Sequence, residues 1–289
     1  MFKSILDADR EGKGNPKLED IDLVDDYPQP QYEQDLWCAK GDATALTLPK
    51  HADTIKNRRQ LILCPSFWRY GTFEGGVHRE WPNVVTRKCS NIAYRVSRRM
   101  ETLGEVLLHE YTHIDEIVQP PLPRPAAVDP MVKDFADNFH DSRELALTDP
   151  GKAKYNADSY AKFATELTWS TRCKRDFEEP FEDNGFDSSV KPVGVRRQEP
   201  RQDIQLAPSL HKRTAFSQPY QHPIPKTNVD NTYTVEQMDQ FLEGHIDALQ
   251  LCRVAIKQST KNPARFDKIF RQYFRPNDRE LVISKFMLR

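Results

Sequence analysis

Residues 107–114 read Leu-Leu-His-Glu-Tyr-Thr-His-Ile, and this segment constrains the structure of the chain more than any other. On an α-helix, His109 and His113 lie one turn apart on the same face, so their two imidazoles can share one zinc ion. Glu110 is rotated about 100° from His109, which brings its carboxylate near a metal-bound water without making it a ligand. The segment therefore predicts a helix with one metal-binding face.

The flanking residues favour this interpretation over a solvated helix with two unrelated histidines. The sequence Thr-Leu-Gly-Glu at 102–105 is a capping box, which predicts a helix from there to about residue 116. The apolar residues at 106–108 predict that this helix is mostly buried, and buried histidines need partners such as a metal. Zinc lowers the pKa of a bound water to about 7, and Glu110 can then take the proton and pass it to a leaving amine. These residues predict a zinc-dependent endopeptidase.

A zinc site of this kind needs a third protein ligand. The extended pattern H-E-x-x-H-x-x-G-x-x-H is absent, because Glu116 stands at its glycine position and Gln119 at its third histidine position. Glu144 is a candidate ligand on a following helix, although a charge facing solvent is the more ordinary interpretation of that residue. The motif alone leaves the third ligand open.

Three segments, in this order, resemble the deuterolysin and peptidyl-Lys metalloendopeptidase family, the aspzincins. They are QLILCPSFW at 60–68, LLHEYTH at 107–113, and the run from KDFA to NADSYA at 133–161. The family's third ligand is the aspartate of G-T-x-D-x-x-Y-G, and the matching residue is Asp134. The resemblance covers roughly residues 33 to 170, and it implies a zinc ion held by His109, His113 and Asp134. It also implies a disulfide between Cys38 and Cys64.

One departure from the family pattern concerns catalysis. The family's tyrosine after the third ligand offers its hydroxyl to the oxyanion on the scissile carbonyl, and Asp137 occupies that position here. An ionised Asp137 would repel the oxyanion, and loss of an oxyanion donor typically costs about 10²–10³ in kcat. Tyr111 and Tyr160 are two tyrosines that could replace the donor. The alternative function is a pseudo-enzyme that binds zinc and a protein partner, and a third is a structural helical protein without metal.

Asp158 matches an aspartate that helps Lys-specific members of the family bind the lysine after the cleaved bond. The resemblance therefore implies that Asp158 contacts the substrate. The companion acidic position is Ala161 in this chain, so specificity for lysine is not predicted. A helix cap or a hydrogen-bond anchor is the other interpretation of Asp158.

Composition limits the partners and the compartment. With 289 residues and a formal net charge of −1, the chain has no bulk positive field for nucleic acid. It contains no run of about 18 apolar residues, so no membrane span is expected. Residues 1–10 lack the apolar core of a signal peptide, whereas the resembling family is typically secreted, so the compartment stays open. The expected partner is a protein or peptide substrate, and the oligomeric state is not predicted.

The predicted fold class is α+β: a mainly helical, zincin-type catalytic domain with a small sheet, followed by a C-terminal helical hairpin. Residues 1–32 are expected to form a polar arm, 33–174 the catalytic domain, and 175–232 a linker rich in proline and charge. Residues 233–289 are expected to form the hairpin. It either docks where the family has a hairpin before its catalytic half, in a circularly permuted arrangement, or begins a truncated second copy.

Within the catalytic domain we expect two strands and three helices. Residues 43–48 and 59–64 read as strands. After the helix with the two histidines, a second helix is expected at about 130–147, with Asp134 near its start. A third is expected from Asp149-Pro150 to about residue 171, since proline suits the first helical position.

Overall fold

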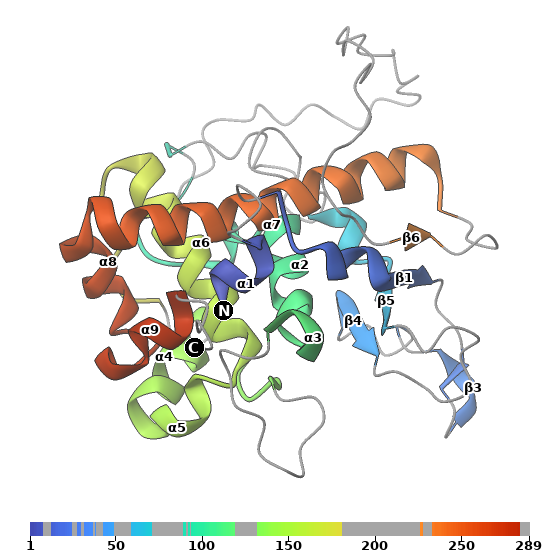
Figure 1. The fold of residues 1–289 in the computed structure, drawn as a ribbon, viewed down its shortest axis with the longest axis horizontal. Coiled ribbons are helices and arrows are strands. Elements are labelled where there is room, and N and C mark those ends of the chain that lie inside the picture. Colours follow the sequence, from blue (N-terminus) through green and yellow to red (C-terminus); the bar gives the residue numbers. More distant parts are fainter. Residues whose placement is uncertain are drawn as a thin grey trace, which may run out of the picture.

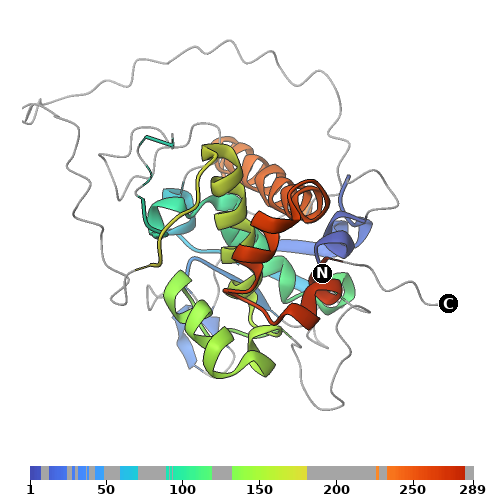
Figure 2. The ribbon, with the colours of Figure 1, turned by 90° about the vertical axis from the view of Figure 1, so that its left-hand side faces the viewer.

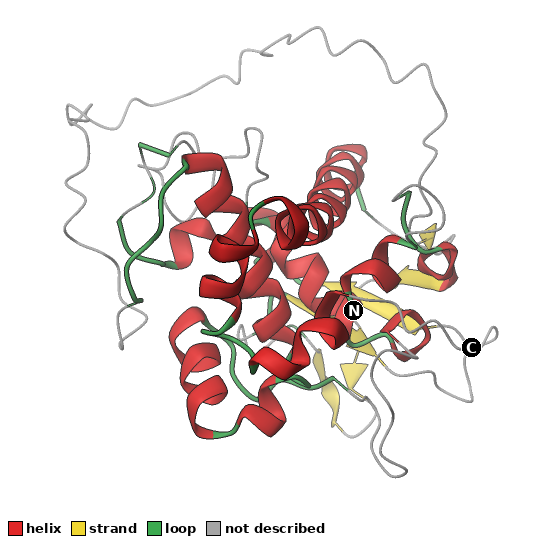
Figure 3. Ribbon diagram, turned by 60° about the vertical axis from the view of Figure 1, so that its left-hand side comes forward, coloured by secondary structure: helices red, strands yellow, loops and turns green. Residues whose placement is uncertain are grey.

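Helices make up most of the structure, and a small sheet lies to one side of them (Figures 1 and 3). The computed structural model describes residues 1–7, 13–24, 28–29, 32–36, 38, 43–48, 59–70, 89–90, 92, 94–118, 132–180, 226–227 and 233–283. The α+β class predicted from the sequence is confirmed at this level. Among the described residues, no helix is long and apolar enough to span a membrane.

Four strands form the main sheet, in the order β4-β5-β1-β6. They are β4 (Ala45–Leu48), β5 (Arg59–Leu63), β1 (Ile21–Val24) and β6 (Lys226–Thr227). β1 is parallel to β5 and β6, whereas β4 runs antiparallel to β5 along the outer side of the sheet. The strands predicted at 43–48 and 59–64 are therefore confirmed. A separate antiparallel pair joins β2 (Pro28–Gln29) to β3 (Tyr32–Leu36).

The helix that carries the two histidines, α2 (Leu103–Thr112), begins at the predicted cap. The side chain of Thr102 accepts a hydrogen bond from the backbone amide of Glu105 at 3.1 Å. The α-helix ends one residue before His113, which keeps a right-handed helical conformation, with φ −74° and ψ −10°. His113 thus stays one turn from His109 although it closes the helix. A short helix, α3 (Asp115–Val118), follows.

Two of the predicted helix boundaries are wrong. The helix expected at 130–147 begins at residue 139, as α4 (Phe139–Thr148), because the side chain of Asn138 accepts from the amide of Asp141 and caps it there. Asp134 therefore lies in a loop. The helix expected from residue 150 to about 171 is divided into α5 (Pro150–Ala153) and α6 (Ala157–Cys173). Asn156 interrupts it, since its backbone is extended and forms a parallel bridge with Lys133.

The C-terminal helices pack in the same hydrophobic core as α2, the helix that carries the H-E-x-x-H motif. α7 (Val235–Lys261) begins at a complete capping box between Thr234 and Gln237 and lies across α2 and α6 (Figure 1). α8 (Pro263–Phe270) and the short α9 (Arg279–Ile283) follow. Two glycines permit the close crossing of α2 and α7. A Cβ at Gly104 would lie 2.4 Å from Cβ of Asp247, and one at Gly244 would lie 2.8 Å from Cβ of Leu103. The circularly permuted arrangement stays a prediction.

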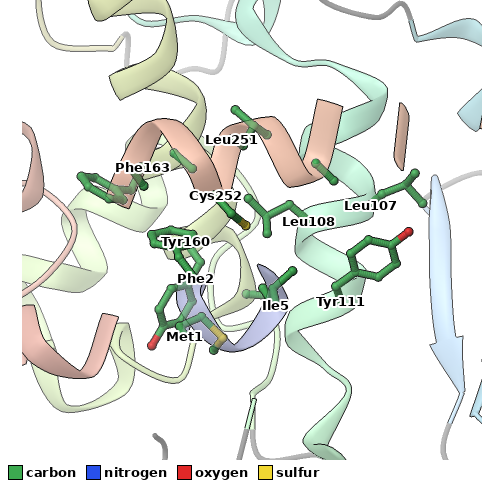
Figure 4. Packing of buried hydrophobic residues seen from close by; sticks show 14 of the residues in the cluster. Met1, Phe2, Ile5, Leu107, Leu108, Tyr111, Tyr160, Phe163, Leu251 and Cys252 are labelled. Carbon is green, nitrogen blue, oxygen red and sulfur yellow. The ribbon is translucent and has the colours of Figure 1, made fainter. Parts of the chain in front are cut away.

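The N-terminal residues do not form the polar arm predicted for 1–32. α1 (Phe2–Leu6) packs against α7, and Met1, Phe2 and Ile5 are fully buried among side chains of α2, α6 and α7 (Figure 4). The amine of Met1 donates to the carbonyl of Leu281 at 2.9 Å, which places the first residue beside α9 (Figure 2). The prediction was wrong because the acidic average of residues 1–32 outweighed the few apolar residues of α1. Burial of each large apolar side chain contributes about 1.5–3 kcal/mol to the stability of the fold.

Two disulfides tie the described residues together. The Cys38–Cys64 bond implied by the resemblance is present, and a second, unpredicted bond joins Cys89 to Cys173. Cys252 is a buried free thiol on α7. Of the predicted linker 175–232, residues 181–225 and 228–232 lie outside the described residues. Its described ends contact the rest of the chain, since Glu178 bridges to Arg95 and β6 pairs with β1.

Candidate metal centre

Three side chains from two parts of the chain bring their donor atoms together. Nε2 of His109 lies 3.0 Å from Oδ1 of Asp134, and Nε2 of His113 lies 3.2 Å from the same oxygen. The two Nε2 atoms are 3.2 Å apart. Tetrahedral zinc with ligand bonds of about 2.0–2.1 Å sets neighbouring donors about 3.3 Å apart. The three predicted ligands therefore form a group that could hold a metal ion.

Both imidazoles are oriented through their other nitrogen. Nδ1 of His109 is 2.6 Å from Oδ1 of Asp158, and Nδ1 of His113 is 2.9 Å from the carbonyl oxygen of Val132. An ionised carboxylate and a carbonyl can only accept, so each Nδ1 carries the proton and donates it. When the ring is neutral, each Nε2 then has a lone pair that points toward the shared Asp134 oxygen. Donation by the other ring nitrogen to a carboxylate or carbonyl is the usual second contact of a metal-binding histidine.

The electrostatics at this point favour positive charge. Burial by itself favours the neutral form of both histidines. Asp158 and Asp134 nevertheless raise the pKa of His109 well above its usual value, and Asp134 raises the pKa of His113. The pKa of Asp134 is lowered despite its partial burial, because both imidazoles bond to it. Two lone pairs and a carboxylate oxygen at 3.0–3.2 Å repel one another unless a proton or a metal cation lies between them.

A cavity of about 520 Å³ opens beside the three donors. Glu110 lies in its wall and is almost fully buried, and Oε2 of Glu110 accepts a hydrogen bond of 2.8 Å from the hydroxyl of Thr47. Thr47 belongs to β4, whose residues 45–47 form part of the same wall. The candidate general base is thus held by the outer strand of the sheet, next to the donors.

The two other predicted site residues also line the cavity. Asp137 is exposed to solvent, in the loop that carries Asp134. Asp158 is buried at the start of α6, where it accepts from His109. The interpretation of Asp158 as a hydrogen-bond anchor is therefore what the structure shows, while its contact with a substrate stays a prediction.

Three other suggestions from the sequence do not fit the site. The hydroxyl of Tyr160 donates to the carbonyl of Lys154 at 2.6 Å, and that of Tyr111 is bonded to Nδ1 of His245 at 2.7 Å. Both rings are fully buried outside the cavity wall, so neither replaces the family's tyrosine. Glu144 lies on the exposed face of α4, 3.9 Å from His140, and is not among the residues around His109 and His113. A solvent-facing charge was the correct interpretation of it.

A buried cluster of charged side chains in the cavity wall was not predicted from the sequence. Nζ of Lys162 lies 2.9 Å from Glu101, 2.5 Å from Glu105 and 3.9 Å from Asp158. Burial lowers the pKa of Lys162, but these carboxylates raise it well above its usual value. Burial raises the pKa of Glu105 to about 7, against the effect of Lys162. Only the i, i+4 spacings of Glu101 with Glu105 and of Asp158 with Lys162 could have indicated the cluster, and such spacings are common on exposed helices.

Comparison of the chain with protein-family models, with curated proteins and with solved structures finds no match. The resemblance to the aspzincins therefore rests on the motifs quoted above and stays a prediction.

Proposed function

We propose that this protein is a zinc-dependent endopeptidase of the aspzincin type. The observation that carries the proposal is the spacing of the three donors at 3.0–3.2 Å, with both Nδ1 atoms already donating elsewhere. Two nitrogen donors and one carboxylate are a ligand set that catalytic zinc uses, and a fourth position is left for water or substrate. Calcium and magnesium prefer oxygen donors throughout, so a histidine pair argues against them.

The residues around the donors fit hydrolysis of a peptide. Zinc, when bound, lowers the pKa of a coordinated water to about 7 and polarises a carbonyl. Glu110 supplies a carboxylate that can take a proton and return it to the leaving amine. Thr47 fixes one oxygen of that carboxylate, which limits the directions in which the other can act. β4 is the last strand of its sheet among the described residues, so an extended peptide in the cavity could pair with its backbone.

The experiment that tests the proposal measures zinc content and cleavage of unfolded casein. Wild type should retain about one zinc per chain after dialysis. Glu110→Gln should keep the zinc and lose activity by about 10²–10⁴-fold, because only the proton acceptor is removed. Glu144→Gln, an exposed carboxylate on α4, is the matched control and should behave as wild type. Wild-type protein without zinc, or cleavage that survives Glu110→Gln, would reject the proposal.

A pseudo-enzyme is the second candidate, and one observation favours it. Asp137 lines the cavity where the resembling family has a tyrosine, and the hydroxyls of Tyr111 and Tyr160 are engaged elsewhere. In that case the protein binds zinc without cleaving casein, and Glu110→Gln leaves its binding of a protein partner unchanged.

A further inference from the structure

We propose that Asn156 is a positioning residue for the metal centre, which holds the loop of Asp134 at the distance the two histidines require. The inference rests on the proposed zinc site. Oδ1 of Asn156 accepts from the backbone amides of Phe135 and Ala136, at 2.8 and 3.0 Å. Nδ2 donates to the hydroxyl of Ser159 at 3.1 Å. Two amide donors on one oxygen fix the orientation of the side-chain amide.

Asn156 is placed to cap a helix, yet its side chain does not do so. It is the N-cap residue of α6, a position at which asparagine ordinarily accepts from an amide of the first helical turn. Here the side chain makes no cap bond and turns to the neighbouring loop instead. The side chain is fully buried, so its two bonds to the loop are shielded from water. The first turn of α6 therefore lacks a side-chain cap, and the side-chain oxygen of Asn156 stabilises the loop of Asp134 instead.

The backbone beside Asn156 holds the same loop. The amide of Lys133 donates to the carbonyl of Tyr155 at 2.8 Å, and the amide of Ala157 donates to the carbonyl of Lys133 at 3.0 Å. Residues 155–157 therefore bond to the chain on both sides of Asp134. The side chain of Asp134 is itself 58% exposed, and its contacts with the two histidines are to the donor atoms of the centre. Its position consequently depends on how firmly the backbone around it is held.

Residues 155–158 thus contribute to the positions of all three candidate ligands. Asn156 holds the loop of Asp134, and Asp158, two residues later, orients His109. The same loop supplies the Val132 carbonyl that orients His113. Loss of the Asn156 side chain should loosen Asp134, while Asp158 and the backbone bonds that hold Lys133 beside the Val132 carbonyl stay in place.

The test is zinc affinity, measured by competition with a chromophoric chelator, together with the melting temperature of the zinc-free proteins. Asn156→Ala should weaken zinc binding by about 10- to 100-fold, as removal of outer contacts does at other metal sites. Ser159→Ala is the matched control. It removes the other partner of the same buried amide without touching the loop, and should leave zinc affinity unchanged. Asn156→Asp keeps an acceptor oxygen for both amides and should rescue most of the affinity.

The outcomes separate this inference from the proposed function. Wild type that binds no zinc rejects the metal centre itself. Wild type that binds zinc with the same affinity as Asn156→Ala overturns the role of Asn156 and leaves the centre standing. An equal loss of affinity in Ser159→Ala would also overturn it, because a general weakening of α6 would then explain both. If Asn156→Ala does not fold, Asn156→Ser keeps a polar group in the buried site that is too short to reach the loop, and the same loss is expected.

Discussion

Asp137 is the residue on which the two candidate functions differ. It is exposed and lines the cavity, and it matches the position of the tyrosine that serves the oxyanion in the resembling family. Asp137→Asn removes a charge that would oppose the oxyanion and places an amide donor there. We expect kcat on a peptide substrate to rise by up to about tenfold, with little change in KM. A fall in kcat would mean that the Asp137 carboxyl itself takes part in the reaction.

Glu105 should make the stability of the fold depend on pH. Its pKa of about 7 in the folded protein lies above the ordinary value of 4.5, mainly because it is buried. The folded state therefore holds this proton more tightly than the unfolded chain. Its contribution is fully present below about pH 4.5 and is lost as the pH rises to about 7.

Glu105→Gln stays neutral at every pH, so the variant should gain stability relative to wild type between pH 5 and pH 8. The gain is at most about 3–4 kcal/mol, at 1.36 kcal/mol for each pKa unit. Urea unfolding of the two proteins at each pH measures it, and taking their difference cancels the titration of groups that do not interact with Glu105. A difference in stability that does not vary with pH would contradict the raised pKa.

At the level of elements, helix starts that depend on contacts between neighbouring residues could be predicted from the sequence. The caps at Thr102 and Thr234 lie within three residues of the amides they bond, and both helices begin where the sequence indicates. The loop at 132–138 could not be predicted in this way. It is held by Tyr155, Asn156 and Ala157, some twenty residues later, and that contact keeps Asp134 out of the helix expected at 130–147.

Gly104→Ala tests the crossing of α2 and α7. Alanine in place of glycine ordinarily stabilises a helix by up to about 1 kcal/mol. Here the added methyl carbon would lie 2.4 Å from Asp247 and 2.7 Å from the backbone of α7, so the helices must separate. We expect a loss of about 1–3 kcal/mol in urea unfolding. Gly151→Ala on α5 is the control, since its nearest neighbour is an Asp149 side-chain oxygen at 3.3 Å, and it should be neutral or stabilising.

At the level of the whole molecule, the grouping of the three candidate ligands could be predicted and the residues around them could not. His109, His113 and Asp134 follow from motif spacing and family resemblance. The Lys162 cluster, and the burial of Phe2 against Tyr160 and Phe163, depend on contacts between residues more than fifty positions apart. No window of the sequence shows such contacts. The average polarity of residues 1–32 concealed the few apolar side chains that complete the core.

The two disulfides should contribute unequally to global stability. Cys38–Cys64 closes a separation of 26 residues and Cys89–Cys173 one of 84. Closing these loops in the unfolded chain contributes about 3.5 and about 4.5 kcal/mol in the chain-entropy treatment. Replacing Cys89 and Cys173 by serine should therefore lower the free energy of unfolding more than replacing Cys38 and Cys64. The opposite order would show that native contacts around Cys64, which is buried beside β4 and β5, outweigh loop length.

The amides of Phe135 and Ala136 carry one more consequence. Both are bonded to a side-chain oxygen and not to another strand or turn of backbone, so their protons can exchange with solvent only when that one contact opens. Their hydrogen-exchange rates give the local opening free energy of the Asp134 loop, separate from the unfolding of the whole chain. Slower exchange at these two positions on addition of zinc would measure, in the intact protein and without any substitution, how strongly the ion and the loop stabilise each other.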